Sequence, residues 1–296
     1  MRSSPVSPPP RFGVRATDRD SYGPAVASVA EKLGFGLMPW QRHVTEVALE
    51  HADGQLAYRD AVIATPRQSG KSSLVLALVV HRMLSAPQQR VAYAAQTRLA
   101  ARTRLFEVWF PRIRRSPLRD MFGLSRATGA ETLRCTNGSI LTLLSTEEAA
   151  GHGETLDLGV LDEAWALTAA AEQSVRPAMV TRRNAQLWTI STAGTEKSAF
   201  LRSKVDAGRT VAQAGLTDGF AYFEWSAPDE ADPGDPATWR ACMPALGHTV
   251  DEATIAADLA AMDTAEFRRA YLCQWPEVAM EGWRVIPRDV WQAARL

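Results

Sequence analysis

Short apolar runs alternate with helical patterns of apolar residues along most of the 296-residue chain. The first run, AVIAT, begins shortly after Tyr58 and leads through the turn TPRQSG into a helical stretch over residues 71–84. A second run over residues 90–95 precedes a longer helical pattern over residues 97–115. Each pair predicts a strand followed by a helix. The expected buried stripe of the longer helix is Leu99, Phe106, Val108, Trp109 and Ile113.

The alternation continues after a predicted hairpin. The segments ETLRC and SILTLLS flank the pair Asn137-Gly138, which is the strongest hairpin signal in the chain. The run LDLGVLDEAW then predicts a buried strand that ends in two acids, and it is followed by a helix over residues 169–181, a strand over 186–192 and a helix from about Lys197. Strands that alternate with helices in this way predict an α/β fold, a three-layer sandwich with a mostly parallel sheet.

The composition changes near both ends of the chain. The first residues, MRSSPVSPPPRFGVR, are rich in Pro, Ser and Arg, so we expect a disordered arm over residues 1–20. The α/β core is expected over residues 21–225. From Ala227 an acidic, turn-rich stretch, APDEADPGDP, precedes two short helical patterns, which predict a small C-terminal helical lid within residues 226–296.

Charge and cysteine usage narrow the possible functions. The chain has 33 basic and 33 acidic residues, and a net charge of zero argues against a protein that coats nucleic acid non-specifically. Its three cysteines lie far apart without metal-ligand spacing and are expected to be buried small side chains. The first fifteen residues contain no apolar run long enough for a signal peptide or a membrane span, so we expect a cytoplasmic protein.

Arginines crowd one predicted helix and the turn after it. They can contact a nucleic-acid backbone, face a neighbouring subunit, or remain solvated, and the sequence leaves these three alternatives open. The residues are Arg98, Arg102, Arg104, Arg112, Arg114, Arg115 and Arg119. The later segment from Asp229 to Asp263 is acidic, so one molecule presents two faces of opposite charge.

A phosphate-binding loop is predicted where Gly70, Lys71 and Ser72 lie between a strand and a helix. Backbone N–H groups of such a loop face the β-phosphate, Lys71 supplies charge to the β- and γ-phosphates, and the Ser72 hydroxyl coordinates Mg²⁺. The general pattern GxxxxGKS/T would place a glycine at Thr65, so the first position departs from it. The alternative is a chance surface GKSS, which the flanking apolar elements disfavour.

The buried strand ending at Asp162 and Glu163 supplies the second half of the predicted site. It carries both carboxylates to the sheet edge beside the loop, where Asp162 can bind Mg²⁺ through water. Glu163 can orient and deprotonate the attacking water. The alternative is a strand end followed by a helix-capping acid pair.

Three segments resemble the terminase large-subunit ATPase of tailed phages: TPRQSGKS at residues 65–72, VLDEAW at 160–165 and TISTAGT at 189–195. The resemblance spans roughly Pro39 to Trp283. It implies a P-loop NTPase fold of the ASCE/RecA-like type, with ATP and Mg²⁺ as cofactors. The ATP-binding residues that it implies are Trp40, Gln41, Thr65, Pro66, Arg67, Gln68, Ser69, Gly70, Lys71, Ser72 and Ser73.

The same resemblance implies further roles. Arg67 would contact the γ-phosphate from within the subunit, although it can also bind a loop carbonyl. Gln41 would read the adenine edge, and the alternative is a helix start with a packed Trp40. Ser191 and Thr192 would sense the γ-phosphate and relay its loss to the lid, or serve only as polar groups at a strand end.

Two features depart from the family pattern. Many terminases have an arginine shortly before the second carboxylate motif, where this chain has His152 between two glycines. Arg182, Arg183 and Arg202 are therefore candidates for an arginine finger that acts on a neighbour's nucleotide, and a surface salt bridge is the alternative for each. The family continues into a nuclease domain, but we find no cluster of metal-binding acids here and expect no nuclease activity before Leu296.

The resemblance implies an ATP-hydrolysing motor that translocates double-stranded DNA into a procapsid. Its implied partners are the portal protein, the small terminase subunit and other copies of the chain in a ring, expected to be a pentamer, with no membrane. The implied location is the host cytoplasm, with transient docking at the procapsid portal. A helicase-like translocase and a nucleotide-binding scaffold without turnover remain alternatives, and Glu163 favours turnover over a scaffold.

Overall fold

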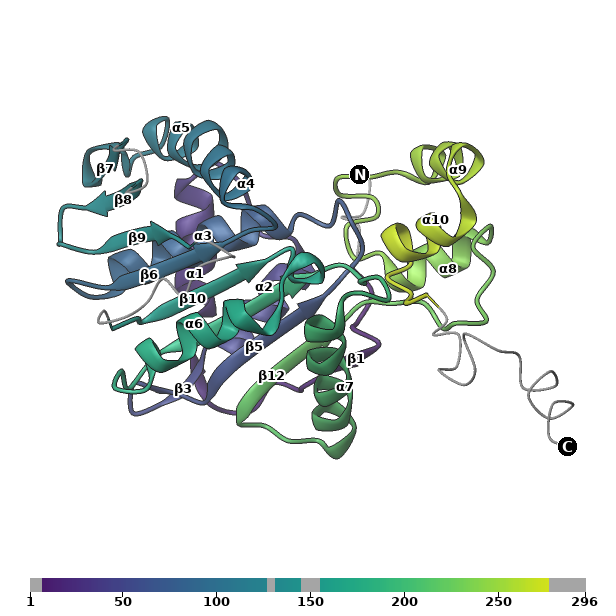
Figure 1. The fold of residues 1–296 in the computed structure, drawn as a ribbon, viewed down its shortest axis with the longest axis horizontal. Coiled ribbons are helices and arrows are strands. Elements are labelled where there is room, and N and C mark those ends of the chain that lie inside the picture. The colour runs from purple at the N-terminus through teal and green to yellow at the C-terminus, as the bar shows by residue number, and fades with distance from the viewer. Residues whose placement is uncertain (1–6, 127–130, 145–154, 277–296) are drawn as a thin grey trace, which may run out of the picture.

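The computed structural model describes residues 7–126, 131–144 and 155–276. Within these ranges the main sheet has nine strands (Figure 1). In their order across the sheet, the strands are β1 (Phe12–Gly13), β12 (Gly219–Glu224), β5 (Tyr58–Ala64), β11 (Gln186–Ser191), β10 (Leu158–Asp162), β6 (Arg90–Ala94), β9 (Ile140–Leu143), β8 (Thr132–Cys135) and β7 (Phe122–Ser125). A small second sheet contains β2 (Asp20–Ser21), β3 (Glu50–Ala52) and β4 (Gln55–Leu56).

The centre of the main sheet is parallel, as the sequence predicts. Strands β12, β5, β11, β10, β6 and β9 pair in parallel, whereas the outer strands β1, β8 and β7 pair antiparallel. The predicted hairpin is the β8–β9 pair. Strand β11 lies between β5 and β10, with Asp162 opposite Ile190 and Ser191 opposite Ala64. The carboxyl ends of these three strands therefore meet at one sheet edge.

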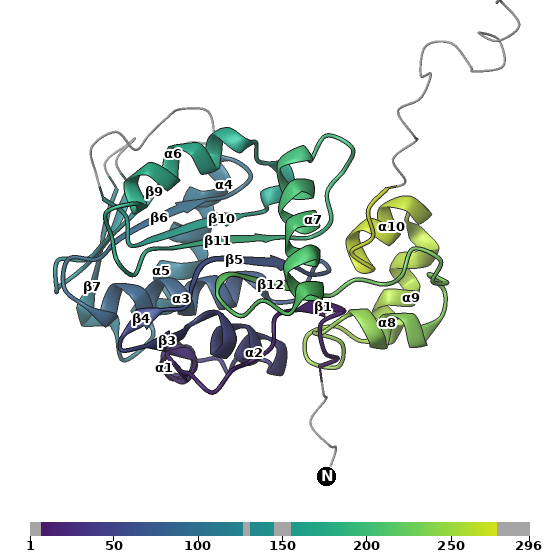
Figure 2. The same ribbon diagram turned by 90° about the horizontal axis from the view of Figure 1, so that it is seen from below.

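Helices cover both faces of the sheet and complete the predicted three layers (Figure 2). One face packs against α1 (Gly23–Lys32), α2 (Pro39–Ala48), α3 (Lys71–Ser85) and a continuous helix made of α4 (Arg98–Thr103), the π-helix η1 (Arg104–Trp109) and α5 (Phe110–Arg114). The other face packs against α6 (Ala169–Met179) and α7 (Ala199–Ala214). Short 3-10 turns occur at η2 (Arg119–Met121) and η3 (Ala164–Ala166).

The helix from α4 to α5 buries a narrower row than the sequence predicts. Ala101, Leu105, Trp109 and Ile113 recur every fourth residue and are all buried. Leu99 and Val108 fall off this row, and they are 68% and 51% exposed. Their assignment to the buried stripe is therefore wrong.

The predicted lid consists of α8 (Pro236–Cys242), α9 (Glu252–Ala261) and α10 (Thr264–Tyr271). Trp239, Ile255, Phe267 and Leu272 belong to a hydrophobic core of its own, separate from the two cores that cover the sheet. Figure 1 shows these helices beside the sheet rather than over one of its faces. The three cysteines are buried and free, as expected.

Residues 7–20 differ from the expected disordered arm. Phe12 and Gly13 pair with Phe223 and Glu224 at the sheet edge, and Val14 is buried. Edge pairing needs only a few backbone hydrogen bonds, so a Pro-rich composition does not prevent it. Across the described ranges, no helix combines the length and apolarity that crossing a membrane would require.

Candidate active site

The predicted phosphate loop connects β5 to α3 at the carboxyl edge of the sheet. Gly70 begins the helix with φ of 82°, a left-handed conformation that favours glycine. A Cβ atom at this position would lie 2.4 Å from Cε of Met38, so the end of that flexible side chain would have to shift. Within the loop, the Ser69 hydroxyl donates to the Pro66 carbonyl oxygen over 2.8 Å. The sequence at the loop thus fits the turn that a phosphate cradle needs.

Helix α2 supports this loop through Gln41. The Gln41 amide nitrogen donates to the Gly70 carbonyl oxygen at 2.9 Å, and its amide oxygen accepts from the Met38 backbone at 2.8 Å. Both ends of the amide therefore have partners within the protein. Recognition of adenine by Gln41 stays a prediction, and it would require the amide to exchange these partners for the base. Trp40 is 1% exposed and packs edge-on against Trp225, which fits the alternative of a helix start with a packed Trp40. Its role in ATP binding stays a prediction.

Lys71 lies buried at the start of α3. Its Nζ donates to the carbonyl oxygen of Pro66 at 2.8 Å and more distantly to that of Thr65 at 3.4 Å. Burial lowers the pKa of the Lys71 amine, while Glu163 and Asp162 oppose that shift. A phosphate is the kind of anion that would stabilise this buried charge.

Oxygen atoms of Asp162 and Ser72, the two expected metal ligands, converge on one point, which a nitrogen atom of Arg104 occupies. Nη1 of Arg104 lies 2.5 Å from Oδ2 of Asp162 and 2.7 Å from Oγ of Ser72. The Tyr93 hydroxyl also donates to Oδ2, over 2.9 Å. A hydroxyl and a carboxylate gathered around one cationic atom fit Mg²⁺, which prefers oxygen ligands and commonly completes its shell with phosphates and water. Ser72 and Asp162 are thus the residues that would hold the metal.

Burial dominates the ionisation of this cluster. It raises the pKa of the fully buried Asp162 carboxyl, and Glu163 acts in the same direction, whereas Arg104 opposes it. Burial also opposes the charge on Arg104, but Tyr93, Asp162 and Glu163 together raise its pKa. The guanidinium therefore remains charged and compensates the carboxylate.

Glu163 follows directly in a strained backbone conformation. Its φ of 53° is left-handed, which is uncommon for a residue other than glycine and often marks a functional position. The Glu163 Oε2 atom accepts from the indole nitrogen of Trp165 at 2.9 Å. The structure thus places the predicted catalytic acid beside Asp162 and holds it through an indole that the sequence did not single out.

Strand β11 contacts both the phosphate loop and the segment after Glu163. The Ser191 carbonyl oxygen accepts from the Thr65 backbone N–H at 3.0 Å. The Ser191 hydroxyl oxygen accepts from the Trp165 backbone N–H, also at 3.0 Å. Thr192 donates to the carbonyl oxygen of Arg269 on α10 over 3.4 Å. Ser191 therefore joins the phosphate loop to the segment after Glu163, and Thr192 reaches the lid.

Arg67 faces the lid. Its backbone N–H donates to the Ala270 carbonyl oxygen at 2.7 Å, and its Nη1 lies 3.1 Å from Oε1 of Glu266. Glu266 also accepts from Arg269, whose guanidinium stacks 5.3 Å from the Trp165 ring centroid. A line of contacts thus runs from Arg67 through the lid to the indole that holds Glu163.

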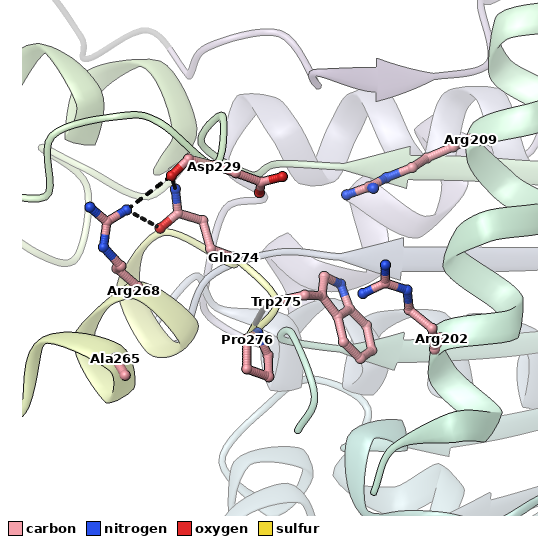
Figure 3. A pocket seen from close by; sticks show the side chains of 8 residues that line it. All are labelled: Arg202, Arg209, Asp229, Ala265, Arg268, Gln274, Trp275 and Pro276. Carbon is pink, nitrogen blue, oxygen red and sulfur yellow. Dashed lines mark hydrogen bonds between the residues drawn. The ribbon is translucent and has the colours of Figure 1, made fainter. Parts of the chain in front are cut away.

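The three candidate trans arginines all have partners inside the chain. Arg182 lies near Asp157, before β10 begins, and Arg183 donates to Gln55. Arg202 lies 3.4 Å from Asp206 and over the Trp275 ring (Figure 3). A trans role stays a prediction for each, and His152 lies outside the described residues.

Arg202 also borders a cavity of about 680 Å³ between α7 and the lid (Figure 3). Inside it, Arg268 donates to the Gln274 side chain and to the Asp229 carbonyl oxygen. The lining residues are Arg202, Arg209, Asp229, Ala265, Arg268, Gln274, Trp275 and Pro276.

The arginine-rich helix is less open to outside partners than its composition suggests. Arg98 and Arg102 pair with Glu131, and Arg104 turns into the site. The sequence missed Arg104 and Glu266 as members of the site, because a crowded basic helix and an acidic lid carry no local signal for one inward contact. Trp165 lies within the VLDEAW motif, so that motif was the available signal.

This geometry defines a P-loop NTPase, with the phosphate loop, the metal-ligand carboxylate and the adjacent acid at the ends of neighbouring parallel strands. Residues 62–207 match the family model described as "Terminase large subunit, T4likevirus-type, N-terminal". Over this segment the chain is similar to the terminase large subunit family. No curated protein matches the chain by sequence.

Solved structures share the fold at low identity. The large terminase of bacteriophage HK97 is 21% identical with a TM-score of 0.72, covering 86% of this chain and 55% of its own. The ATPase domain of a Thermus phage large terminase, in a mutant form, is 18% identical with a TM-score of 0.56, covering 83% of this chain and 97% of its own. A large terminase from a thermophilic bacteriophage, in complex with ATP-gamma-S, is 14% identical with a TM-score of 0.52, covering 84% and 52%. The chain thus spans about half the length of the HK97 protein.

Proposed function

We propose that this chain is the ATP-hydrolysing motor domain of a phage large terminase that translocates double-stranded DNA into the procapsid. The observation that carries the proposal is the convergence of Lys71, Ser72, Asp162 and Glu163 at one sheet edge, with lid contacts to the same loop. The family match over residues 62–207 and the structure of a relative with ATP-gamma-S support it.

Each residue of the site has a role in hydrolysis. Lys71 and the loop N–H groups would bind the β- and γ-phosphates, and Ser72 and Asp162 would hold Mg²⁺. When bound, Mg²⁺ neutralises charge on the phosphate oxygens. Glu163, released from Trp165, orients the attacking water and accepts its proton. Arg67 exchanges Glu266 for the γ-phosphate, so that hydrolysis alters a contact with the lid.

The wider assembly belongs to the same proposal. A ring of chains, expected to be a pentamer, would dock on the portal protein in the host cytoplasm and receive DNA with the small terminase subunit. An arginine from the next subunit would complete the site, with Arg182, Arg183 and Arg202 as candidates.

The test is nucleotide binding and turnover by two variants. Lys71→Ala should lose Mg·ATP binding, because it removes the buried phosphate partner. Glu163→Gln should bind Mg·ATP but lose about two or more orders of magnitude in turnover, the usual contribution of a general base. Calorimetry measures the first effect, and phosphate release from the purified chain measures the second.

Two exposed residues give matched controls. Lys32→Ala and Glu46→Gln make the same chemical changes on α1 and α2, away from the phosphate loop, and should leave both measurements unchanged. Wild-type turnover in Glu163→Gln would reject the catalytic assignment. Mg·ATP binding by the wild-type chain without any turnover, including under ring-forming conditions, would instead favour the nucleotide-binding scaffold.

A further inference from the structure

Arg104 lies at the point where the two expected metal ligands meet. Its Nη1 atom bridges Oδ2 of Asp162 at 2.5 Å and Oγ of Ser72 at 2.7 Å. Arg104 comes from the helix after β6. Ser72 lies at the start of α3, after β5, and Asp162 is the last residue of β10. Three separate elements therefore place one guanidinium nitrogen between the two ligand oxygens.

The surroundings explain why a cation is needed there. The Asp162 side chain is fully buried, and its other hydrogen-bond donors are the Tyr93 hydroxyl and the Glu163 backbone N–H. Neither of these donors carries a positive charge. A buried carboxylate without a countercharge is costly, so Arg104 supplies compensation by direct contact, in addition to the charge of Lys71.

A magnesium ion and this guanidinium cannot share the position. Mg²⁺ binds its oxygen ligands directly at about 2.0–2.1 Å or through water. An ion held by Ser72 and near Asp162 would lie in the space that Nη1 occupies. Metal binding in the proposed site therefore requires Arg104 to move.

We propose that Arg104 is an internal counter-ion that occupies the metal position and is displaced when Mg·nucleotide binds. The inference rests on the proposed nucleotide site and adds a competition between a side chain and the metal. It makes Arg104 a positioning residue, because it keeps Ser72 and Asp162 gathered in the arrangement that the metal uses.

The local structure permits this displacement. Arg104 begins η1, and π-helical turns are rare and frequently occur at functional positions. Its side chain is 25% exposed, so a path to solvent exists on one side. Leaving Asp162 would cost little once Mg²⁺ supplies the countercharge.

The experiment compares nucleotide affinity with and without metal. A fluorescent ADP analogue is titrated into the chain in Mg²⁺ and again in EDTA. The quantity compared is the Kd in EDTA divided by the Kd in Mg²⁺. Arg104→Gln keeps a donor for Asp162 but removes the competing charge. If Arg104 holds the position in about nine of ten wild-type molecules, the variant should bind the Mg²⁺ form about tenfold more tightly. EDTA binding should not improve, so the ratio should rise by at least that factor.

Arg102→Gln is the matched control. It removes one arginine charge from the same continuous helix, but Arg102 pairs with Glu131 and not with the metal ligands. Its ratio should equal that of the wild type. A ratio in Arg104→Gln that also equals the wild-type value would overturn the inference, provided that wild-type Mg·ADP binding is intact. No wild-type binding of Mg·ADP would reject the proposed function itself.

A second measurement needs no variant. The crystal structure of the wild-type chain with Mg·ADP should show the Arg104 guanidinium beyond hydrogen-bond distance of Asp162 and Ser72. A bound metal ion with Arg104 still bridging both residues would overturn the inference even if Arg104→Gln failed to fold.

Discussion

Two arginines reach the same site in different environments. Arg67 meets Glu266 across the lid contact, where the two side chains are 41% and 39% exposed. Arg104 meets Asp162, which is fully buried. An exposed pair exchanges partners at little cost, whereas a buried pair is costly to break when one member is removed. The difference in exposure fits the two proposals, that Arg67 responds to phosphate and that Arg104 maintains the site before the metal binds.

The partner of Arg67 is itself shared. Hydrogen bonds from Arg269 lower the pKa of Glu266, so this carboxyl remains charged near neutral pH. Losing Arg67 would still leave Glu266 bound to Arg269. Asp162 has no second arginine among its recorded hydrogen bonds in the described part of the chain. Loss of Arg67 would therefore leave Glu266 with an arginine partner, whereas loss of Arg104 would leave Asp162 with none among the residues that the structure describes.

The largest effect is expected when the buried pair is broken. Arg104→Met should lower the free energy of unfolding by about 3 kcal/mol, because it removes the cation that contacts the buried Asp162 directly and leaves only the charge of Lys71 acting on it. Urea unfolding of the nucleotide-free chain measures it. Asp162→Asn added to Arg104→Met should recover part of the lost stability. An Arg104→Met protein as stable as the wild type would show that the Arg104–Asp162 pair costs no more to break than the exposed Arg67–Glu266 pair.

A third arginine pair, remote from phosphate chemistry, sharpens the comparison. Burial raises the pKa of Glu224, but Arg209, Ser226 and Tyr222 bond to it and hold the pKa below its ordinary value of 4.5. Glu224→Gln should therefore cost about 2 kcal/mol at neutral pH, the usual value of charged hydrogen bonds. Because the folded pKa is depressed, this contribution is present above 4.5 and is lost as pH falls through the folded value. Urea unfolding at several pH values should show wild type and variant converging in acid, and a constant gap would contradict the assignment.

The smallest effect concerns the exposed pair. Glu266→Gln should change the free energy of unfolding by less than about 1 kcal/mol, as expected for a solvent-exposed ion pair. It should tighten binding of an ATP analogue a few-fold, because Arg67 loses a competing partner, and leave ADP binding unchanged. Calorimetry with both nucleotides measures this. Glu252→Gln, which breaks an exposed lid pair with Arg240, is the control, and equal tightening of ADP would exclude a γ-phosphate response.

The sequence predicted the elements whose pattern is local. The phosphate loop, the strand ending at Asp162 and the hairpin at Asn137 each combine an apolar run with a turn signal, and the structure has all three. The expected arrangement of Lys71, Ser72, Asp162 and Glu163 at one edge followed because parallel strands bring their carboxyl ends together.

The remaining features depend on contacts between distant segments. Arg104 could not be separated from its neighbouring arginines, because its inward direction depends on how the helix packs against β6. Trp40 fits an adenine motif by sequence, but it packs against Trp225, which follows β12 and is distant in the sequence. Residues 12–13 form an edge strand only because β12 offers a partner.

The separate core of the lid has a mechanical consequence. A group of helices packed around Trp239 and Phe267 resists internal deformation, so a force applied to one helix displaces the whole group. The backbone hydrogen bond between Arg67 and Ala270 attaches this stiff body to the phosphate loop at one of its ends. We therefore expect a shift of the phosphate loop to move the three lid helices together.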